Sequence, residues 1–338
     1  MQRLSAKHLS FTLVIVLPIA VLMGVVVGPE LILPFVSSVD PSTISNQLII
    51  EQIRLPRTLL AGLVGATLAV AGVMMQGLFR NALADPSLIG VSSGASAGAS
   101  FVIVFGVGLF GSHELVGVSA VAIGAFLGAI SATFLVYRLA ASATGTSVAT
   151  MLLAGIAISA LAGAINSFFS FIADNHMLRQ ISLWQMGSLS SASWPRVIMA
   201  ASLFGALFLW IPRYSTALNA FLLGESEARH LGIDVDRIKV QIIIVVALAV
   251  GLCVALTGTI AFVGLITPHI VRMLIGPDHK GLIPCCMLAG AILLMIADAV
   301  SRFILAPGEL PIGVVTALLG APFFLSLLYR QRANLGER

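Results

Sequence analysis

Residues 58–79 read TLLAGLVGATLAVAGVMMQGLF, an apolar run without one charged side chain. A helix needs about 20 such residues to cross the hydrocarbon core of a bilayer. Small residues recur along the run, including Gly65 and Gly72, and small side chains let the backbones of membrane helices approach closely. The stretch therefore predicts a membrane-spanning helix that packs tightly against its neighbours.

The rest of the chain has the same apolar character. Of its 338 residues, 59% are apolar and 9% are charged, against about 45–50% and about 25% in soluble domains. We expect one all-α transmembrane domain over residues 1–338, with an uncleaved first helix and ten spans in all. The expected spans are residues 10–28, 58–79, 88–110, 117–138, 149–172, 195–212, 240–260, 261–275, 282–301 and 310–329.

The basic residues predict the orientation of these spans. Ten crossings put both termini on one side, and a cytoplasmic placement leaves thirteen of the 18 Lys and Arg residues inside, as the positive-inside rule requires. The five outside are Arg54, Arg57, Arg179, Arg196 and Arg302. The similar strings GATLAVAG at 65–72 and GLCVALTG at 251–258 lie five spans apart, which suggests a weak inverted repeat.

Composition and motifs exclude several classes of function. The net charge of +4 comes from scattered residues and forms no basic stripe, so nucleic-acid binding is not expected. The three cysteines lie singly or adjacent in apolar runs and predict neither a metal site nor a disulfide. None of the lysines follows a glycine, which excludes a phosphate loop of the chain's own. Any energy from ATP must come through a partner.

The longest polar stretch is RYSTALNAFLLGESEARHLGIDVDRIKV at 213–240. We expect residues 213–239 to form two short cytoplasmic helices, broken at Gly224 and Gly232. Apolar side chains among the charged ones would serve as contacts for a partner protein. An ordinary solvated loop has the same composition, so both interpretations remain open here.

Four motifs resemble one known family. They are RLPRTLLAGLVGATLAVAGVMMQGLFRNALADPSLIGVSSGA at 54–95, LLGESEARHLGI at 222–233, GTIAFVGLITPHIVRMLIGPDHK at 258–280 and ELPIGVVTALLGAPFFLSLL at 309–328. In this order they resemble the FecCD family of ABC importer permeases, which carry ferric siderophores, haem and cobalamin. The chain departs from the family pattern at Ala82 and Thr267, where only local loop geometry is in doubt.

The resemblance implies a transport subunit without an ATPase site, in a bacterial inner membrane. A second copy would complete a homodimer around a central pathway, and two cytoplasmic ABC ATPase subunits would use ATP and Mg. A periplasmic substrate-binding protein would dock outside, and the chain itself would bind no cofactor and no metal. The segment expected to contact the ATPase contains Leu222, Leu223, Gly224, Glu225, Ala228, Leu231 and Gly232.

The resemblance also implies sites outside and within the membrane. Arg54, Arg57 and Arg302 match arginines that the family presents to carboxylates of the binding protein. Local pairs compete with this role, Arg302 with Asp298 and Arg54 with Glu51. The pathway is expected along the fifth and tenth spans, at Ser159, Gly163, Asn166, Thr316 and Gly320, where a core helix interface would show the same spacing.

The sequence motifs indicate the class of transporter more strongly than they indicate its substrate. The strings QGLFRN at 76–81 and WQMGSL at 184–189 resemble haem permeases most. We therefore expect haem first, a ferric siderophore second and cobalamin third. An ion-coupled secondary transporter is the alternative from another class, although the span interiors carry few ionisable side chains for such coupling.

Overall fold

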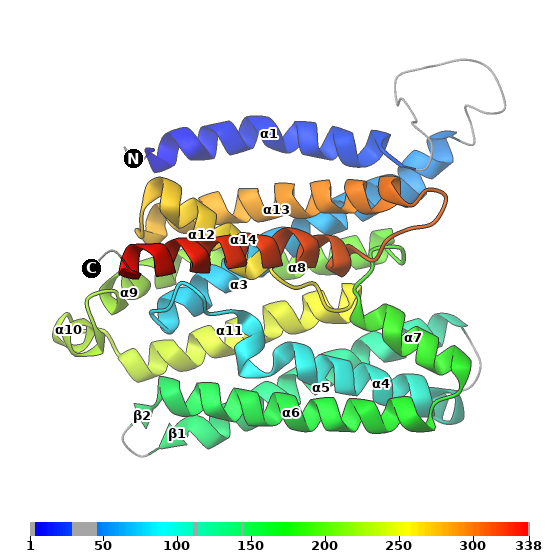
Figure 1. Cartoon of the computed structure of the whole chain (residues 1–338), viewed down its shortest axis with the longest axis horizontal. Helices are drawn as coiled ribbons and strands as arrows, with labels where there is room; N and C mark the ends of the chain where they lie inside the picture. The colour runs from blue at the N-terminus through cyan, green and yellow to red at the C-terminus, as the bar shows by residue number, and fades with distance from the viewer. Residues whose placement is uncertain (1–3, 29–45, 111–113, 143–144, 337–338) are drawn as a thin grey trace.

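The computed structural model describes residues 4–28, 46–110, 114–142 and 145–336, and nearly all of these residues are helical. Most helices run along the long axis of the molecule and form one bundle (Figure 1). The elements are α1 (Ala6–Val26), η1 (Ile50–Arg54), α3 (Leu55–Leu78), η2 (Pro86–Ile89), α4 (Val91–Phe110), α5 (Glu114–Ala140), β1 (Ala141–Ser142), β2 (Gly145–Thr146), α6 (Val148–Ile172), α7 (Asn175–Gln185), α8 (Trp194–Trp210), α9 (Pro212–Phe221), α10 (Glu225–His230), α11 (Val235–Thr257), α12 (Val263–Ile275), α13 (His279–Ile304) and α14 (Ile312–Gly336). The expected all-α class is confirmed, with one two-residue antiparallel hairpin, β1–β2.

Each of the ten expected spans coincides with a helix of this bundle. Six described helices are long and apolar enough to cross a membrane, and the pair α8 and α9, bent by 55° at its junction, gives a seventh. Helices α4, α12 and α14 contain shorter apolar stretches. The multi-pass character is therefore clear, and the count of ten crossings stays a prediction. The amphipathic helix α7 was not expected from the sequence.

Helix α3, which contains the stretch quoted first, lies in the centre of the bundle. In its most apolar window 89% of the residues are buried, against 17% for the peripheral helix α1. It packs against α11, α12 and α13. A Cβ on Gly65 would collide with the carbonyl oxygen of Gly290, and one on Gly72 with that of Gly264. The predicted tight packing through small residues is confirmed at both glycines.

A second close contact joins α4 and α5. A Cβ on Gly94 would meet the backbone of Gly128, and one on Gly98 would meet that of Gly124. These residues lie in the small-residue stretch at 92–100 and in the span that follows it. Because lipid provides no hydrophobic drive for helix association, such backbone contacts replace it with dispersion attraction.

The two ends of the bundle differ. Helix α1 begins and α14 ends at the end from which α10 projects (Figure 1). Helices α3 and α11 pack together and run in opposite directions, as an inverted repeat requires. The repeat itself, and the cytoplasmic placement of this end, stay predictions.

Candidate functional site

The short helix α10 forms the tip of the projecting end. It begins after Gly224, whose φ is 123°, and is followed by Gly232, whose φ is 81°. Backbone of this kind strains every residue except glycine. The expected breaks at Gly224 and Gly232 are therefore present, and they turn the chain out of the bundle and back into α11.

Three leucines are exposed around α10, with exposed fractions of 41% for Leu222, 67% for Leu223 and 64% for Leu231. Single exposed leucines are ordinary in water-soluble surfaces, but these three flank a helix of only six residues. The expectation that Ala228 offers an apolar contact to a partner is wrong, because Ala228 is fully buried within the chain. Helix α10 packs on α9 and α11, which hold so short a helix in place, and Ala228 is its buried residue.

Two ion pairs tie α10 to the start of α11. Glu225 accepts from the buried Lys239 at 2.7 Å, and Arg229 pairs with Asp236 at 2.8 Å. Glu225 therefore has a partner within the chain. The exposed surface around α10 is formed by the three leucines together with the polar residues Ser226, Glu227, Arg229 and His230.

A side chain that the sequence did not single out connects this region to α13. Asn219 of α9 donates to Asp278 Oδ1 at 2.6 Å, and its own Oδ1 accepts from the backbone N–H of His279 at 2.9 Å. Asp278 also caps α13 by accepting from the N–H of Lys280. The hydrogen bond from Asn219, aided by that N–H, lowers the pKa of Asp278 below its ordinary value.

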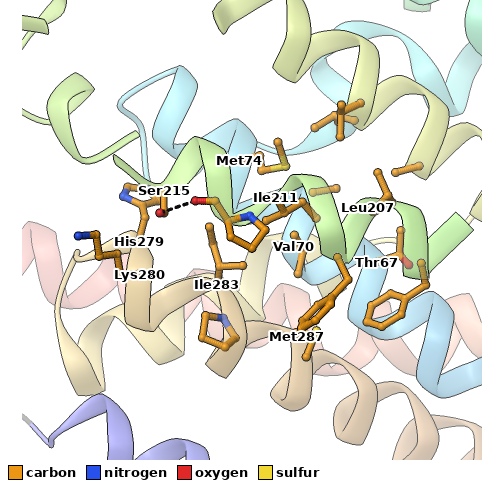
Figure 2. A pocket seen from close by; sticks show the side chains of 18 of the residues that line it. Thr67, Val70, Met74, Leu207, Ile211, Ser215, His279, Lys280, Ile283 and Met287 are labelled. Carbon is orange, nitrogen blue, oxygen red and sulfur yellow. Dashed lines mark hydrogen bonds between the residues drawn. The ribbon is translucent and has the colours of Figure 1, made fainter. Parts of the chain in front are cut away.

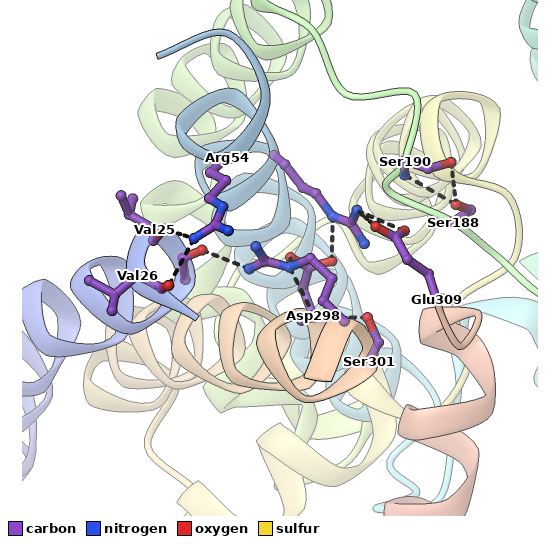
Figure 3. A network of polar contacts seen from close by, with 11 residues as sticks. Val25, Val26, Arg54, Ser188, Ser190, Asp298, Ser301 and Glu309 are labelled. Carbon is purple, nitrogen blue, oxygen red and sulfur yellow. Dashed lines mark hydrogen bonds and ion pairs between the residues drawn. The ribbon is translucent and has the colours of Figure 1, made fainter. Parts of the chain in front are cut away.

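The opposite end of the bundle holds a buried charge network. Arg57 of α3 donates through Nε to Asp298 of α13 at 2.8 Å and through Nη1 to Glu309 at 2.9 Å. Arg302 Nε lies 3.1 Å from Asp298 Oδ2. Figure 3 shows Asp298 lying at the centre of this cluster and Glu309 at its outer side. One carboxylate therefore serves two guanidinium groups.

The network also reaches the end of α1. Arg302 Nη2 donates to the carbonyl of Gly24 at 2.7 Å, and Arg54 Nη1 donates to the carbonyls of Val25 and Val26 at 3.1 and 2.8 Å (Figure 3). Arginines close to the C-terminal carbonyls of a helix satisfy groups that the helix leaves unpaired. These contacts join α1, α3 and α13 at one end of the molecule.

The structure places Arg54, Arg57 and Arg302 at one end of the bundle and inside the protein. Their exposed fractions are 5%, 5% and 3%. The local pair of Arg302 with Asp298 is confirmed, whereas the carboxylate of Glu51 accepts from Gln47. Docking of a binding protein on these arginines stays a prediction.

The five expected pathway residues lie on two separate helices with different surroundings. On α6, Ser159 hydrogen-bonds Ser93 at 3.0 Å and Asn166 accepts from Ser100, so both are held by α4. Gly163 between them is exposed, and a methyl group added to its Cα would meet nothing within 4 Å. On α14, Thr316 donates to the carbonyl of Gly313. Gly320 packs against Phe262 of the loop before α12.

The described residues hold no group of three or more His, Cys, Asp or Glu side chains that could bind a metal ion. Cys253, Cys285 and Cys286 are buried and unpaired with one another. The chemistry that this part of the chain offers is therefore packing, ion pairing and hydrogen bonding.

Sequence reasoning missed Asn219, Asp278 and Glu309. The Asp278 cap had a readable signal, because an aspartate directly before an apolar helical run is a common N-cap. Asn219 and Glu309 had none, since each acts on a residue far away in the sequence.

Comparison with known proteins agrees with this architecture. The model of the FecCD transport family matches residues 11–330. The chain is 44% identical over 280 residues to the hemin transport system permease protein HmuU of Yersinia pestis, covering 83% of each protein. It is 42% identical over 282 residues to the cobalamin import system permease protein BtuC of Halobacterium salinarum, covering 83% of this chain and 73% of the relative.

One solved structure is similar over nearly the whole chain. It is an inward-facing conformation of a metal-chelate type ABC transporter, with a TM-score of 0.84 and 34% sequence identity. The similarity covers 96% of this chain and 99% of the other.

Proposed function

The chain belongs to the FecCD transport family, and from this premise we propose that it forms the membrane pathway for haem in an ATP-driven importer. The class is that of an ABC importer permease of the metal-chelate, haem or cobalamin type, a multi-pass membrane subunit. The observation that carries the choice of haem is the 44% identity to a hemin permease. Cobalamin is second, because a cobalamin permease is 42% identical, and a ferric siderophore is the third candidate.

Energy for transport in this family comes from separate ATPase subunits, and the chain is not itself an enzyme. The ion-coupled secondary transporter that the sequence left as an alternative does not agree with this membership. We propose that the ATPase subunits, which use ATP and Mg, bind at α10 through Leu222, Leu223 and Leu231. Gly224, Gly232, Glu225 and Ala228 would shape that surface rather than form its contact.

The hydrogen bonds of Asn219 support a route for coupling. A movement of α9 and α10 would pull directly on Asp278 and on the first turn of α13 through contacts of 2.6 and 2.9 Å. Helix α13 carries Asp298 at its far end, where the arginine network lies. A continuous helix with polar anchors at both ends would provide a physical link between the two faces.

A periplasmic substrate-binding protein would dock at the end that holds Arg54, Arg57 and Arg302. Of the three arginines, Arg57 is the one that a binding protein can reach most easily, because its ion-pair partner Glu309 lies partly at the surface, with a side chain that is 37% exposed. A carboxylate of the binding protein would take the place of Glu309 on Arg57 and accept from its Nη1, as both oxygens of Glu309 do. Docking in this form exchanges one ion pair for another without uncovering a buried charge.

A second copy of the chain would complete the pathway. The exposed faces of α6 and α14 support this arrangement, because Ile156 and Phe171 on α6 and Leu318 and Leu325 on α14 are between 64% and 87% exposed. Gly163 leaves open space on the face of α6. Small and apolar side chains on such faces give a conduit that binds its cargo weakly.

The test is transport by the assembled importer in proteoliposomes. The permease is reconstituted with its ATPase subunits, and its binding protein is loaded in turn with haem, cobalamin or a ferric siderophore. We expect ATP-dependent accumulation of haem alone. Accumulation of cobalamin but not haem would overturn the choice of substrate while leaving the ABC permease class intact.

A further inference from the structure

A cavity of about 470 Å³ lies beside the bend between α8 and α9. Residues of α8 and α9 form one side, residues of α13 the other, and α3 and α11 close the interior. The two helices meet at an angle of 55° here. No part of this cavity belongs to the expected coupling, docking or pathway residues.

The lining of the cavity is polar at one end and, apart from Thr67, apolar towards the other. Figure 2 shows Ser215, His279 and Lys280 at one end, with Val70 and Met287 towards the other. The apolar part also takes in Phe204, Leu207, Phe208, Val245 and Ala249. A cavity of this kind fits an amphiphile with one long apolar chain.

The polar end carries groups suited to an anionic headgroup. Lys280 is exposed, and its ammonium group makes no ion pair within 4 Å in the described part of the chain. His279 also lines this end but is fully buried, and its Nε2 lies against Gly77 of α3, which is not part of the cavity lining. The oxygens of a phosphate can accept hydrogen bonds from the ammonium group of Lys280.

The depth of this end matches the level of lipid headgroups. At the junction of α8 and α9, Trp210 is 51% exposed and the Arg213 guanidinium lies 5.7 Å from its ring centre. Tryptophan and arginine are enriched at this level of a membrane protein. The apolar part of the cavity then extends from the headgroup level towards the hydrocarbon core.

We propose that this cavity binds one anionic phospholipid of the leaflet next to α10, with an acyl chain between α8 and α13 and the phosphate at Lys280. Water would fill the apolar part of this cavity poorly, because a buried water molecule needs polar groups to hydrogen-bond. An acyl chain from the surrounding bilayer supplies the missing contacts at no cost of transfer from water. The positive charge of Lys280 selects an anionic over a zwitterionic headgroup, as basic residues near a membrane surface do.

Native mass spectrometry of the assembled transporter tests the site. Detergent-purified complex is titrated with phosphatidylglycerol and with phosphatidylcholine of the same acyl chains. We expect one tightly retained phosphatidylglycerol per permease chain. Met287→Trp, which fills the cavity from α13, should weaken its binding about tenfold, and Val245→Trp should do the same from α11. Leu288→Trp, on the neighbouring half-buried residue that does not line the cavity, should have no effect.

The headgroup contact is tested separately. Lys280→Gln should lower the preference for phosphatidylglycerol over phosphatidylcholine by about fivefold, and Lys7→Gln, which removes another exposed lysine, should leave it unchanged. Millimolar inorganic phosphate should not displace the lipid, because it places no chain in the cavity. Equal retention by wild type and both cavity-filling variants would overturn the proposal, as would displacement by phosphate or a complete absence of retained lipid.

Discussion

Asp298 is the residue on which the charge network depends. Its side chain is 1% exposed and neutralises Arg57 and Arg302, which are also buried. Removing one member of a buried ion pair leaves its partner's charge uncompensated and costs about 3–5 kcal/mol. We therefore expect Asp298→Ala to lower the thermal unfolding midpoint of the detergent-solubilised permease strongly.

The surface pair of Arg229 and Asp236 provides the matched control. These side chains are 53% and 39% exposed, and exposed pairs contribute about 1 kcal/mol at most. Asp236→Ala should therefore shift the midpoint only slightly. Equal shifts for the two alanine variants would contradict the central role of Asp298.

Asp278 gives the permease a defined dependence on acid. Its pKa lies below the ordinary value of 3.8 because it accepts from Asn219 and from the N–H of Lys280. An acid with a lowered pKa in the folded state contributes stability above its unfolded pKa and loses it as the pH falls through the folded value. The unfolding midpoints of wild type and Asp278→Asn should differ most near neutral pH. The difference should begin to shrink as the pH falls below about 4. A gap that is constant from pH 7 to pH 3 would exclude this contribution.

At the scale of elements, the close helix contacts around α3 depend on glycines, which have no side chain to keep the backbones apart. A Cβ at Gly72 would strike the backbone of Gly264, which cannot move aside as a flexible side chain can. Gly72→Ala should destabilise the bundle by about 1–3 kcal/mol through overpacking. Gly163→Ala meets nothing within 4 Å and should stabilise α6 by about 0.5–1 kcal/mol, since alanine favours a helix over glycine.

Thermal unfolding of the two alanine variants beside wild type measures both effects. The expected signs are opposite although the chemical change is the same. A destabilisation of similar size at both positions would mean that backbone entropy, and not helix contact, decides the effect.

The element that should bind the ATPase is α10 with its flanking leucines. Leu223 is 67% exposed and lies directly before the Gly224 turn. Leu223→Glu would place a charge in the apolar contact and should reduce co-purification of the ATPase at least about tenfold, as expected for an interface anchor. Leu4→Glu introduces the same charge at another exposed leucine, 50% accessible at the start of the chain, and should leave assembly intact. Undiminished recovery with Leu223→Glu would rule out this surface.

At the scale of the molecule, the sequence predicts helices better than it predicts their contacts. Run length and charge spacing placed a helix at each of the ten expected positions, because a bilayer imposes both. The glycines that join α3 to α13 and α12 were visible as a pattern, but their partners Gly290 and Gly264 were not. From the sequence, the exposure of Ala228, Arg54, Arg57 and Arg302 was predicted from charge and position alone, and all four are buried. Whether such a side chain faces outward depends on which helix it meets, and those neighbours are distant in the sequence.

The proposed pairing with a second copy makes a prediction about α14. In a twofold dimer, residues close to the axis meet their own counterparts in the partner. Leu318 is 66% exposed on α14, so Leu318→Cys should form an oxidative cross-link between two copies in membranes. The three native cysteines are buried and should give little background.

Leu209→Cys provides the control for random collision in the bilayer, because Leu209 is 72% exposed but lies on α8. A disulfide requires Cα atoms within about 7 Å, so only a specific interface yields rapid and complete cross-linking. We expect a dimer band with Leu318→Cys and little with Leu209→Cys. The reverse pattern would place the contact between copies on the α8 side, and the pathway along α6 and α14 would then lose its physical basis, since their exposed faces would meet lipid instead of each other.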